Sequence, residues 1–147
     1  MGLPIYPPVE NDPNGETPES YLAHADYMFH YAARYGNSLL DPAILEARVA
    51  EGQRLSKLQR VQFMEDRNEP DLENFCEGTD THTFSPKQYA AFSSANYDGH
   101  GSNMMYEKGA IKYPVGIKNA DPSMQVVLGG LSDFDYTYLG ELRTEWE

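Results

Sequence analysis

The sequence has a single cysteine and no long apolar run. Cys76 on its own excludes an intramolecular disulfide and a zinc site built on cysteines, and we expect it to be an ordinary thiol. No apolar stretch approaches the ~20 residues of a transmembrane helix, so no membrane span is expected. Residues 1–6 lack the basic start and apolar core of a signal peptide. The compartment in which the protein works stays open.

Basic residues are also scarce. The sequence has 11 Lys and Arg and 23 Asp and Glu, which gives a net charge of -12. This charge repels phosphate backbones and anionic lipid headgroups, so neither nucleic acid nor a membrane surface is expected as a partner. Aromatic residues are plentiful, with Tyr 11, Phe 6 and Trp 1. Aromatic faces and carboxylates together suit a carbohydrate ligand, although ordinary packing of tyrosines explains the composition more simply.

The few histidines do not have the spacing of metal ligands. His24 and His30 are six positions apart, whereas two ligands on one face of a helix stand three or four positions apart. With cysteine ligands also excluded, the sequence predicts no metal site. It carries no motif that requires a cofactor, and none is expected.

Local signals predict an alternation of helices and strands. Thr17-Pro18, Asp41-Pro42 and Ser85-Pro86 are typical of helix starts, because the polar side chain caps the first N–H groups and proline fits the first position. Short apolar runs predict two buried strands. The expected elements are a loop over 1–17, helices over 18–35 and about 42–52, a strand over 61–64, a loop over 72–84, a helix over 86–96, a long loop over 97–114, a helical turn over 115–119, a strand over 125–128 and a helix from 136.

The order of these elements predicts an α/β fold with a parallel sheet. In such folds the reacting groups stand at the carboxyl ends of the strands, where the loops converge. A polar run from Glu65 to Asp71 directly follows the first predicted strand, and Asn68, Glu69 and Pro70 lie inside it. Polar residues are common in such loops, so the triplet by itself is a weak signal.

The context of the triplet resembles a known family. Residues 61–71 resemble the fourth barrel strand of retaining glycoside hydrolases with a (β/α)8 fold, in which an apolar strand leads into Asn-Glu-Pro. Residues 25–36 resemble the third helix of a group of these enzymes, and residues 97–100 and 116–130 resemble the region of the fourth helix and the fifth strand. Order and spacing agree over about residues 17–140.

The resemblance implies that residues 1–147 are a single incomplete catalytic domain. A complete barrel takes roughly 250 residues, so the expected fold is a partial (β/α)8 TIM barrel. Residues 1–17 would be a loop, and residues 18–147 would form the βα units around barrel strands four and five. Strands without their neighbours leave unpaired edges and an uncovered face, so we expect self-association or a complementing chain. The resembled family is often secreted.

The resemblance also implies the roles of two residues. By position, Glu69 is the general acid/base and Asn68 binds the sugar 2-hydroxyl beside the breaking bond. In the retaining mechanism, a second carboxylate about 5 Å from the acid attacks the anomeric carbon. That nucleophile lies on the seventh strand of the family and has no counterpart in this chain. Burial or the charge of the nucleophile would have to raise the pKa of Glu69 if it is to donate a proton near neutral pH.

Further candidate substrate contacts are Asp71, next to the triplet, and Asp98 and His100 in a Gly-rich loop expected to reach the site. Ordering of that loop is the simpler explanation for Asp98 and His100. Likewise, Asp133 and Asp135 follow the second strand, but capping of the last helix explains them more simply.

The family pattern is not complete around the triplet. Arg67 stands where an aromatic residue commonly precedes the asparagine, and Leu72 to Phe75 replace a stretch in which tryptophans are common. The sugar platform is therefore expected to be weaker. Three functions remain open: the acid/base segment of a hydrolase that cleaves β-linked poly- or oligosaccharides, an inactive carbohydrate-binding or remnant barrel, and an acidic interaction domain.

Overall fold

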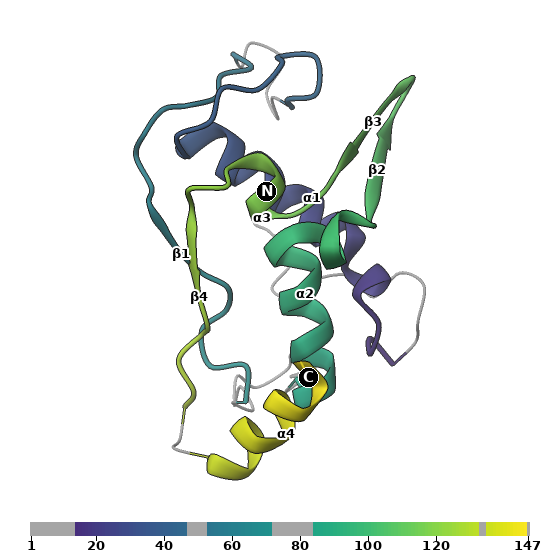
Figure 1. The fold of residues 1–147 in the computed structure, drawn as a ribbon, viewed down its shortest axis with the longest axis vertical. Helices are drawn as coiled ribbons and strands as arrows, with labels where there is room; N and C mark the ends of the chain where they lie inside the picture. The colour runs from purple at the N-terminus through teal and green to yellow at the C-terminus, as the bar shows by residue number, and fades with distance from the viewer. Residues whose placement is uncertain (1–13, 47–52, 72–83, 133–134, 147) are drawn as a thin grey trace, which may run out of the picture.

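The computed structural model describes residues 14–46, 53–71, 84–132 and 135–146 (Figure 1). They form a mixed α/β fold, as predicted, and two parallel strands are present rather than a closed barrel. In chain order the elements are η1 Pro18–Tyr21, α1 Leu22–Tyr35, β1 Phe63–Glu65, α2 Pro86–Ser102, β2 Met105–Lys108, β3 Ile111–Pro114, α3 Ile117–Ala120, β4 Gln125–Val127 and α4 Tyr136–Trp146.

The helix predicted over 18–35 is confirmed as η1 continued by α1. Its apolar face buries Ala25, Phe29 and Ala32, and it ends where the N–H of Gly36 donates to the carbonyl of Ala32 at 2.8 Å. The predicted cap was wrong in one respect. Thr17 makes no side-chain bond to the helix backbone, because its hydroxyl pairs with the Ser20 hydroxyl at 3.1 Å instead.

The start of α2 follows the sequence signal closely. The Ser85 hydroxyl accepts from the N–H of Gln88, and the Gln88 side chain accepts from the N–H of Ser85, which together form a capping box. Helical dihedral angles end before Asp98, close to the predicted limit. Phe92 of this helix meets Tyr21 edge-on with ring centres 5.4 Å apart, so aromatic packing joins α2 to η1.

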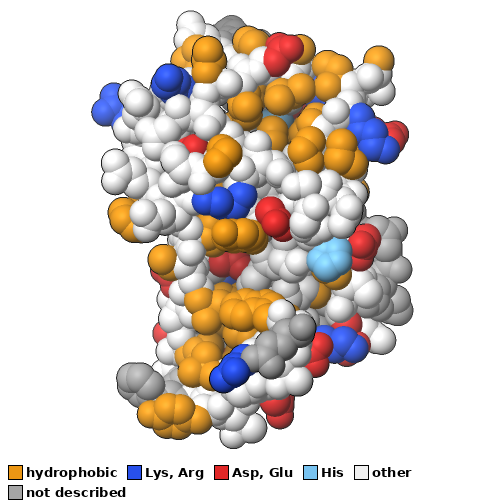
Figure 2. Space-filling view, viewed as in Figure 1, with side chains coloured by type: hydrophobic (Ala, Val, Ile, Leu, Met, Phe, Trp, Pro, Cys, Tyr) orange, Lys and Arg blue, Asp and Glu red, His pale blue; other side chains and the backbone are white. Residues whose placement is uncertain are grey.

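The two predicted strands are present and parallel. Met64 of β1 stands opposite Val126 of β4. Both ends of each strand lie within two residues of the predicted limits. Contrary to expectation, they are not buried on both faces. Met64 is 8% exposed, whereas Phe63 and Val127 on the opposite face are 60% and 44% exposed. The helices lie to one side of this pair in Figure 1, and Figure 2 shows hydrophobic side chains gathered above and below a hollow.

The long loop predicted over 97–114 was wrong, because this segment contains an antiparallel hairpin. Tyr106 of β2 pairs with Tyr113 of β3, and Gly109 takes φ +61° in the turn. The turn lacks the Asn-Gly or Asp-Gly pair that marks most short hairpins. The hairpin packs against α1, since the Tyr113 ring lies 5.0 Å from the ring of Phe29. The helical turn predicted just after it is present as α3.

The helix predicted over about 42–52 was wrong for residues 42–46, and residues 47–52 lie outside the described part. Asp41 accepts from the N–H of Ala43 through its side chain and from the N–H of Ile44 through its carbonyl, so the cap-like sequence closes a turn instead. The predicted loop over 72–84 also falls outside the described part, except for Phe84. Asp135 caps α4 as expected, accepting from the N–H groups of Thr137 and Tyr138.

Candidate functional site

The carboxyl ends of β1 and β4 are tied together by backbone bonds. The N–H of Asp66 donates to the carbonyl of Val127 at 3.1 Å, and the N–H of Glu69 donates to the carbonyl of Gly130 at 2.8 Å. In return, the N–H of Gly130 donates to the Glu65 carboxylate at 3.2 Å. These bonds continue the pairing beyond the strands and place Glu69 at the edge where active sites of parallel sheets form.

Glu69 is half-buried and takes φ +46°, a left-handed conformation that is uncommon outside glycine. Asn68 before it is exposed. Pro70 after it is buried, and its carbonyl accepts from the N–H of Phe84 at 2.9 Å, which anchors the approach to α2. The Arg67 guanidinium lies 4.9 Å from the centre of the Phe84 ring. The triplet is therefore held by β4 on one side and by the entry to α2 on the other.

Asp71 joins the loops that leave the two strands. One carboxylate oxygen accepts from the N–H of Ser132 at 2.9 Å, and the other accepts from the Ser132 hydroxyl at 3.1 Å. Both oxygens thus have partners within the protein. The structure gives Asp71 a role in holding the loops, and substrate contact remains a prediction for it.

Asp98 and His100 are not brought to Glu69. They lie at the carboxyl end of α2, about twelve helical residues or roughly 18 Å from its start beside Pro70. Asp98 accepts from the N–H of Gly101 at 2.8 Å, and His100 pairs with the Ser94 hydroxyl at 3.0 Å. These bonds order the chain between α2 and the hairpin, which is the simpler of the two explanations offered for both residues.

A buried polar chain behind β1 was missed in the sequence. The Asn96 amide donates to Asp66 at 2.8 Å, and its oxygen lies 2.8 Å from Nδ1 of His24. Burial raises the pKa of Asp66, against the opposing effects of Ser93, Asn96 and Arg67. Burial likewise lowers the pKa of His24. The alternation of the strand, with Met64 facing the helices, was the signal that Asp66 faces them too.

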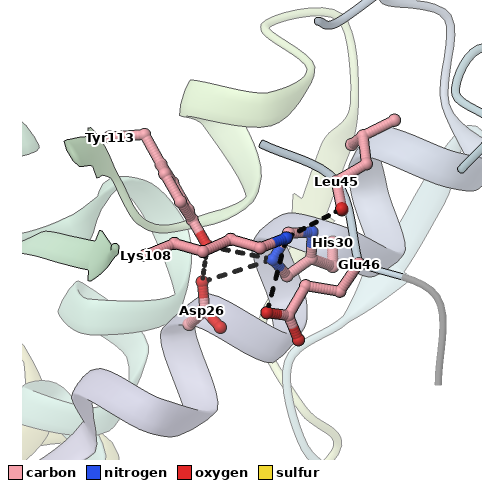
Figure 3. Close-up of polar contacts among 6 residues, drawn as sticks. All are labelled: Asp26, His30, Leu45, Glu46, Lys108 and Tyr113. Carbon is pink, nitrogen blue, oxygen red and sulfur yellow. Dashed lines mark hydrogen bonds and ion pairs between the residues drawn. The ribbon is translucent and has the colours of Figure 1, made fainter. Parts of the chain in front are cut away.

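A second polar cluster lies between α1, the hairpin and residues 41–46 (Figure 3). The Tyr113 hydroxyl donates to Asp26 at 2.8 Å, and Nε2 of His30 lies 3.1 Å from the same hydroxyl. Lys108 donates to the carbonyl of Leu45 at 2.9 Å and also pairs with Glu46 at 3.6 Å. The cluster fastens the hairpin to the helix.

No group of three His, Cys, Asp or Glu side chains in the described part is placed to hold a metal ion. None of the helices described is long and apolar enough to cross a membrane. Comparison with protein-family models, with curated proteins and with solved structures finds no match for this chain. The interpretation of the candidate site therefore depends on the geometry of this structure alone.

The strand-end site offers a half-buried carboxyl next to an exposed amide, a pair that can exchange a proton and bind a hydroxyl. Its flanking carboxylates are already engaged, Glu65 with Gly130 and Asp71 with Ser132. Asp133 lies outside the described residues, and Asp135 caps α4. The described part thus supplies an acid/base candidate without a matching nucleophile.

Proposed function

We propose that this chain is part of a (β/α)8 barrel and carries the general acid/base, Glu69, of a retaining glycoside hydrolase that cleaves β-linked poly- or oligosaccharides. The supporting observation is the bond from the Glu69 N–H to the Gly130 carbonyl beyond a parallel β1–β4 pair. It fixes Glu69 at the carboxyl edge of the sheet, the position where barrel enzymes carry their reacting groups.

In this proposal Glu69 protonates the departing glycosidic oxygen and later takes a proton from the attacking water. Asn68, exposed beside it, binds the 2-hydroxyl of the sugar. The attacking carboxylate comes from outside the described residues, on a complementing polypeptide or a further part of the barrel. The isolated chain is accordingly expected to bind β-linked sugars without cleaving them.

A second function, inactive carbohydrate binding, is favoured by the engagement of both flanking carboxylates. Since Glu65 and Asp71 are bonded to the loop after β4, neither is positioned as an unbonded nucleophile. Cleavage by the chain alone would require one of them to leave its partner. The two functions differ in whether any assembly containing this chain turns over substrate.

The experiment combines hydrolysis and binding. Aryl β-glycosides are incubated with the chain, with Glu69→Gln and with the matched variant Glu65→Gln, which keeps an oxygen for the Gly130 N–H. Nuclear magnetic resonance follows the side-chain amide of Asn68 during titration with cellotetraose or xylotetraose. A shift of this amide without hydrolysis is the expected result. Hydrolysis lost only in Glu69→Gln would show that the chain has its own nucleophile, and an unmoved Asn68 amide would count against a sugar site there.

A further inference from the structure

The scarce basic residues are concentrated on two neighbouring segments, the end of α1 with the residues after it (33–40) and the approach to β1 (53–60). These two segments form the basic surface. Arg54, Lys57 and Arg60 are exposed on it and Arg34 is half-buried, whereas neither segment contains an acidic residue. Figure 2 shows Lys and Arg side chains at the upper left, where Figure 1 draws the chain that leads to β1. A positive surface thus stands on a chain whose net charge is -12.

Backbone bonds hold the two segments together. The N–H groups of residues 57–61 donate to the carbonyls of residues 33–36 at 2.8 to 3.1 Å, and the Arg34 guanidinium donates to the carbonyl of Gln53 at 3.0 Å. A basic side chain near the end of a helix commonly serves to bind the free carbonyls there. Here backbone N–H groups already bind them, so Arg54, Lys57 and Arg60 are not needed for that purpose.

The backbone of the second segment is strained. Lys57 and Gln59 take φ +60° and +54°, the left-handed region that costs free energy for residues other than glycine. Both side chains are exposed, and Leu58 between them is half-buried. Strained positions of this kind are concentrated at functional sites. The fold therefore maintains an unfavourable conformation in which Lys57 faces the solvent.

The basic surface also carries two large apolar side chains. Leu39 is 78% exposed and Leu55 is 41% exposed. The N–H of Leu40 donates to the Ser56 hydroxyl at 3.1 Å, which places the two leucines on segments that lie side by side. Apolar side chains with charged residues around them are typical of a surface that contacts another protein.

Carboxylates within the described part do not neutralise this surface. The ion pairs described there involve other cations, namely His30, Lys87, Lys108 and Lys112. Asp121 lies next to the first segment, but it is buried and accepts hydrogen bonds from Asn37 and Ser38. The charges of Arg54, Lys57 and Arg60 therefore face the solvent and can attract an anionic partner.

We propose that the basic surface binds a short acidic segment of another polypeptide. Its carboxylates pair with Arg54, Lys57 and Arg60, and its apolar side chains cover Leu39 and Leu55. A long polyanion, a membrane or a second copy of the chain would also meet the remaining, strongly acidic surface and be repelled by it. A short segment avoids this repulsion, because charges interact over only about 8 Å at physiological ionic strength. The site precedes β1 and does not depend on the role proposed for Glu69 beyond the opposite end of that strand.

The experiment uses three short rhodamine-labelled peptides of equal length added to the full chain. Aspartate alternates with leucine in the first, asparagine alternates with leucine in the second, and aspartate alternates with serine in the third. Fluorescence anisotropy should show saturable binding of the first peptide and binding at least ~10-fold weaker for the other two, since one lacks the charge and the other the apolar groups. Nuclear magnetic resonance should place the largest backbone amide shifts within residues 33–40 and 53–60.

Two matched double variants test the charges. Arg54→Gln combined with Arg60→Gln should weaken binding of the first peptide about tenfold. Lys87→Gln combined with Lys112→Gln changes the net charge equally on exposed side chains of α2 and β3, and should bind as the unmodified chain does. Leu55→Ser should also weaken binding, and Glu69→Gln should not, which separates this proposal from the catalytic one. Circular dichroism spectra and melting curves verify that each variant folds.

The proposal is overturned if the first peptide gives no saturable signal, or if the asparagine peptide binds equally well. It is also overturned if the two double variants weaken binding to the same extent, because the net charge alone would then explain the effect. Amide shifts confined to other parts of the chain would place the peptide elsewhere and overturn the assignment of the surface. Tighter binding of vesicles that contain phosphatidylserine would overturn the choice of a polypeptide partner.

Discussion

The Tyr113 hydroxyl donates a 2.8 Å hydrogen bond to Oδ1 of Asp26 and so joins β3 to α1 across 87 positions of the chain. This bond uses the single proton of the hydroxyl. Nε2 of His30, 3.1 Å from the same oxygen, must therefore be the donor, which fixes the proton of neutral His30 on Nε2. The attachment of the hairpin thus depends on the protonation of two side chains on α1.

Asp26 should make the folded chain less stable as the pH rises through about 6. Burial raises the pKa of Asp26 from 3.8 to about 6, so the folded state favours its protonated form. The resulting stabilisation is complete below the unfolded pKa and is lost as the pH rises through the folded one. With allowance for partial exposure, the effect is ~1–2 kcal/mol. Melting temperatures of the chain and of Asp26→Asn between pH 4 and 8 should diverge in favour of the variant above pH 6.

His30 changes the stability of the fold in the opposite direction. Burial lowers its pKa, so the stability that neutral His30 contributes to the fold is lost as the pH falls below 6.5. For this reason the variant is compared with the unmodified chain at each pH. Glu107→Gln on the exposed face of the same hairpin is the control and should follow the unmodified chain. Parallel pH profiles for Asp26→Asn and the unmodified chain would contradict the expected linkage.

Helix α2 shows what local sequence predicts well. Ser85, Pro86 and Gln88 lie within four consecutive positions, so the start of the helix could be predicted without knowledge of the rest of the chain. The same kind of signal failed at Asp41, where the cap-like side chain closes a turn. A cap satisfies the first N–H groups of a turn as well as those of a helix, so the local signal alone does not distinguish the two.

The hairpin could not be predicted in the same way, because its support is distant in sequence. Tyr113 packs on Phe29 and donates a hydrogen bond to Asp26. Neither contact can be predicted from the residues around the turn at Gly109. The candidate site likewise has features that the local sequence predicts and contacts that it does not. The position of Glu69 after an apolar strand is a local feature, whereas the pairing of Asp71 with Ser132 depends on which strands meet.

Gly129 should be intolerant of any side chain. A Cβ there would overlap the carbonyl oxygen of Arg67, at the point where the two strand ends meet. Gly129→Ala must therefore push the loops apart, at an expected cost of ~2 kcal/mol or more. The neighbouring Gly130→Ala is the matched control, since a Cβ at that position meets no atom within 4 Å. Urea unfolding should show a lower midpoint for Gly129→Ala alone, and equal midpoints for both variants would refute the close approach.

Asp121 should stabilise the contact between the residues that follow α1 and the segment that precedes β4. Its carboxylate is buried and accepts from the N–H of Asn37 at 2.6 Å and from the hydroxyls of Ser38 and Ser123. Burial acts to raise the pKa of Asp121, but the bonds from Asn37, Ser123 and Ser38 outweigh it and lower the pKa. Its stabilisation is therefore present above pH ~4 and is lost as the pH falls below the unfolded pKa.

Asp121→Asn places an amide N–H next to groups that donate hydrogen bonds to the carboxylate. We therefore expect the free energy of unfolding to fall by ~2–3 kcal/mol at neutral pH. Ser123→Ala removes one donor and should cost ~1 kcal/mol. Thermal unfolding of both variants at pH 7 and pH 3 provides the measurement. The difference between Asp121→Asn and the unmodified chain should shrink at the lower pH. A difference that is the same at both values would mean that the charge of Asp121 contributes nothing.

The uncovered face of the β1–β4 pair should make the chain associate. Phe63 and Val127 are large apolar residues left 60% and 44% exposed on one sheet face, and each strand has a single paired neighbour in the described part. Unpaired edges beside an apolar face recruit further strands, from a second copy or from a complementing chain. Sedimentation velocity over a range of concentrations should show a rising mean mass for the unmodified chain and a smaller rise for Phe63→Ser. Leu39→Ser is the matched control, because Leu39 is 78% exposed outside the sheet and its loss should leave the association unchanged. A monomer at every concentration would mean that this face is stable in water.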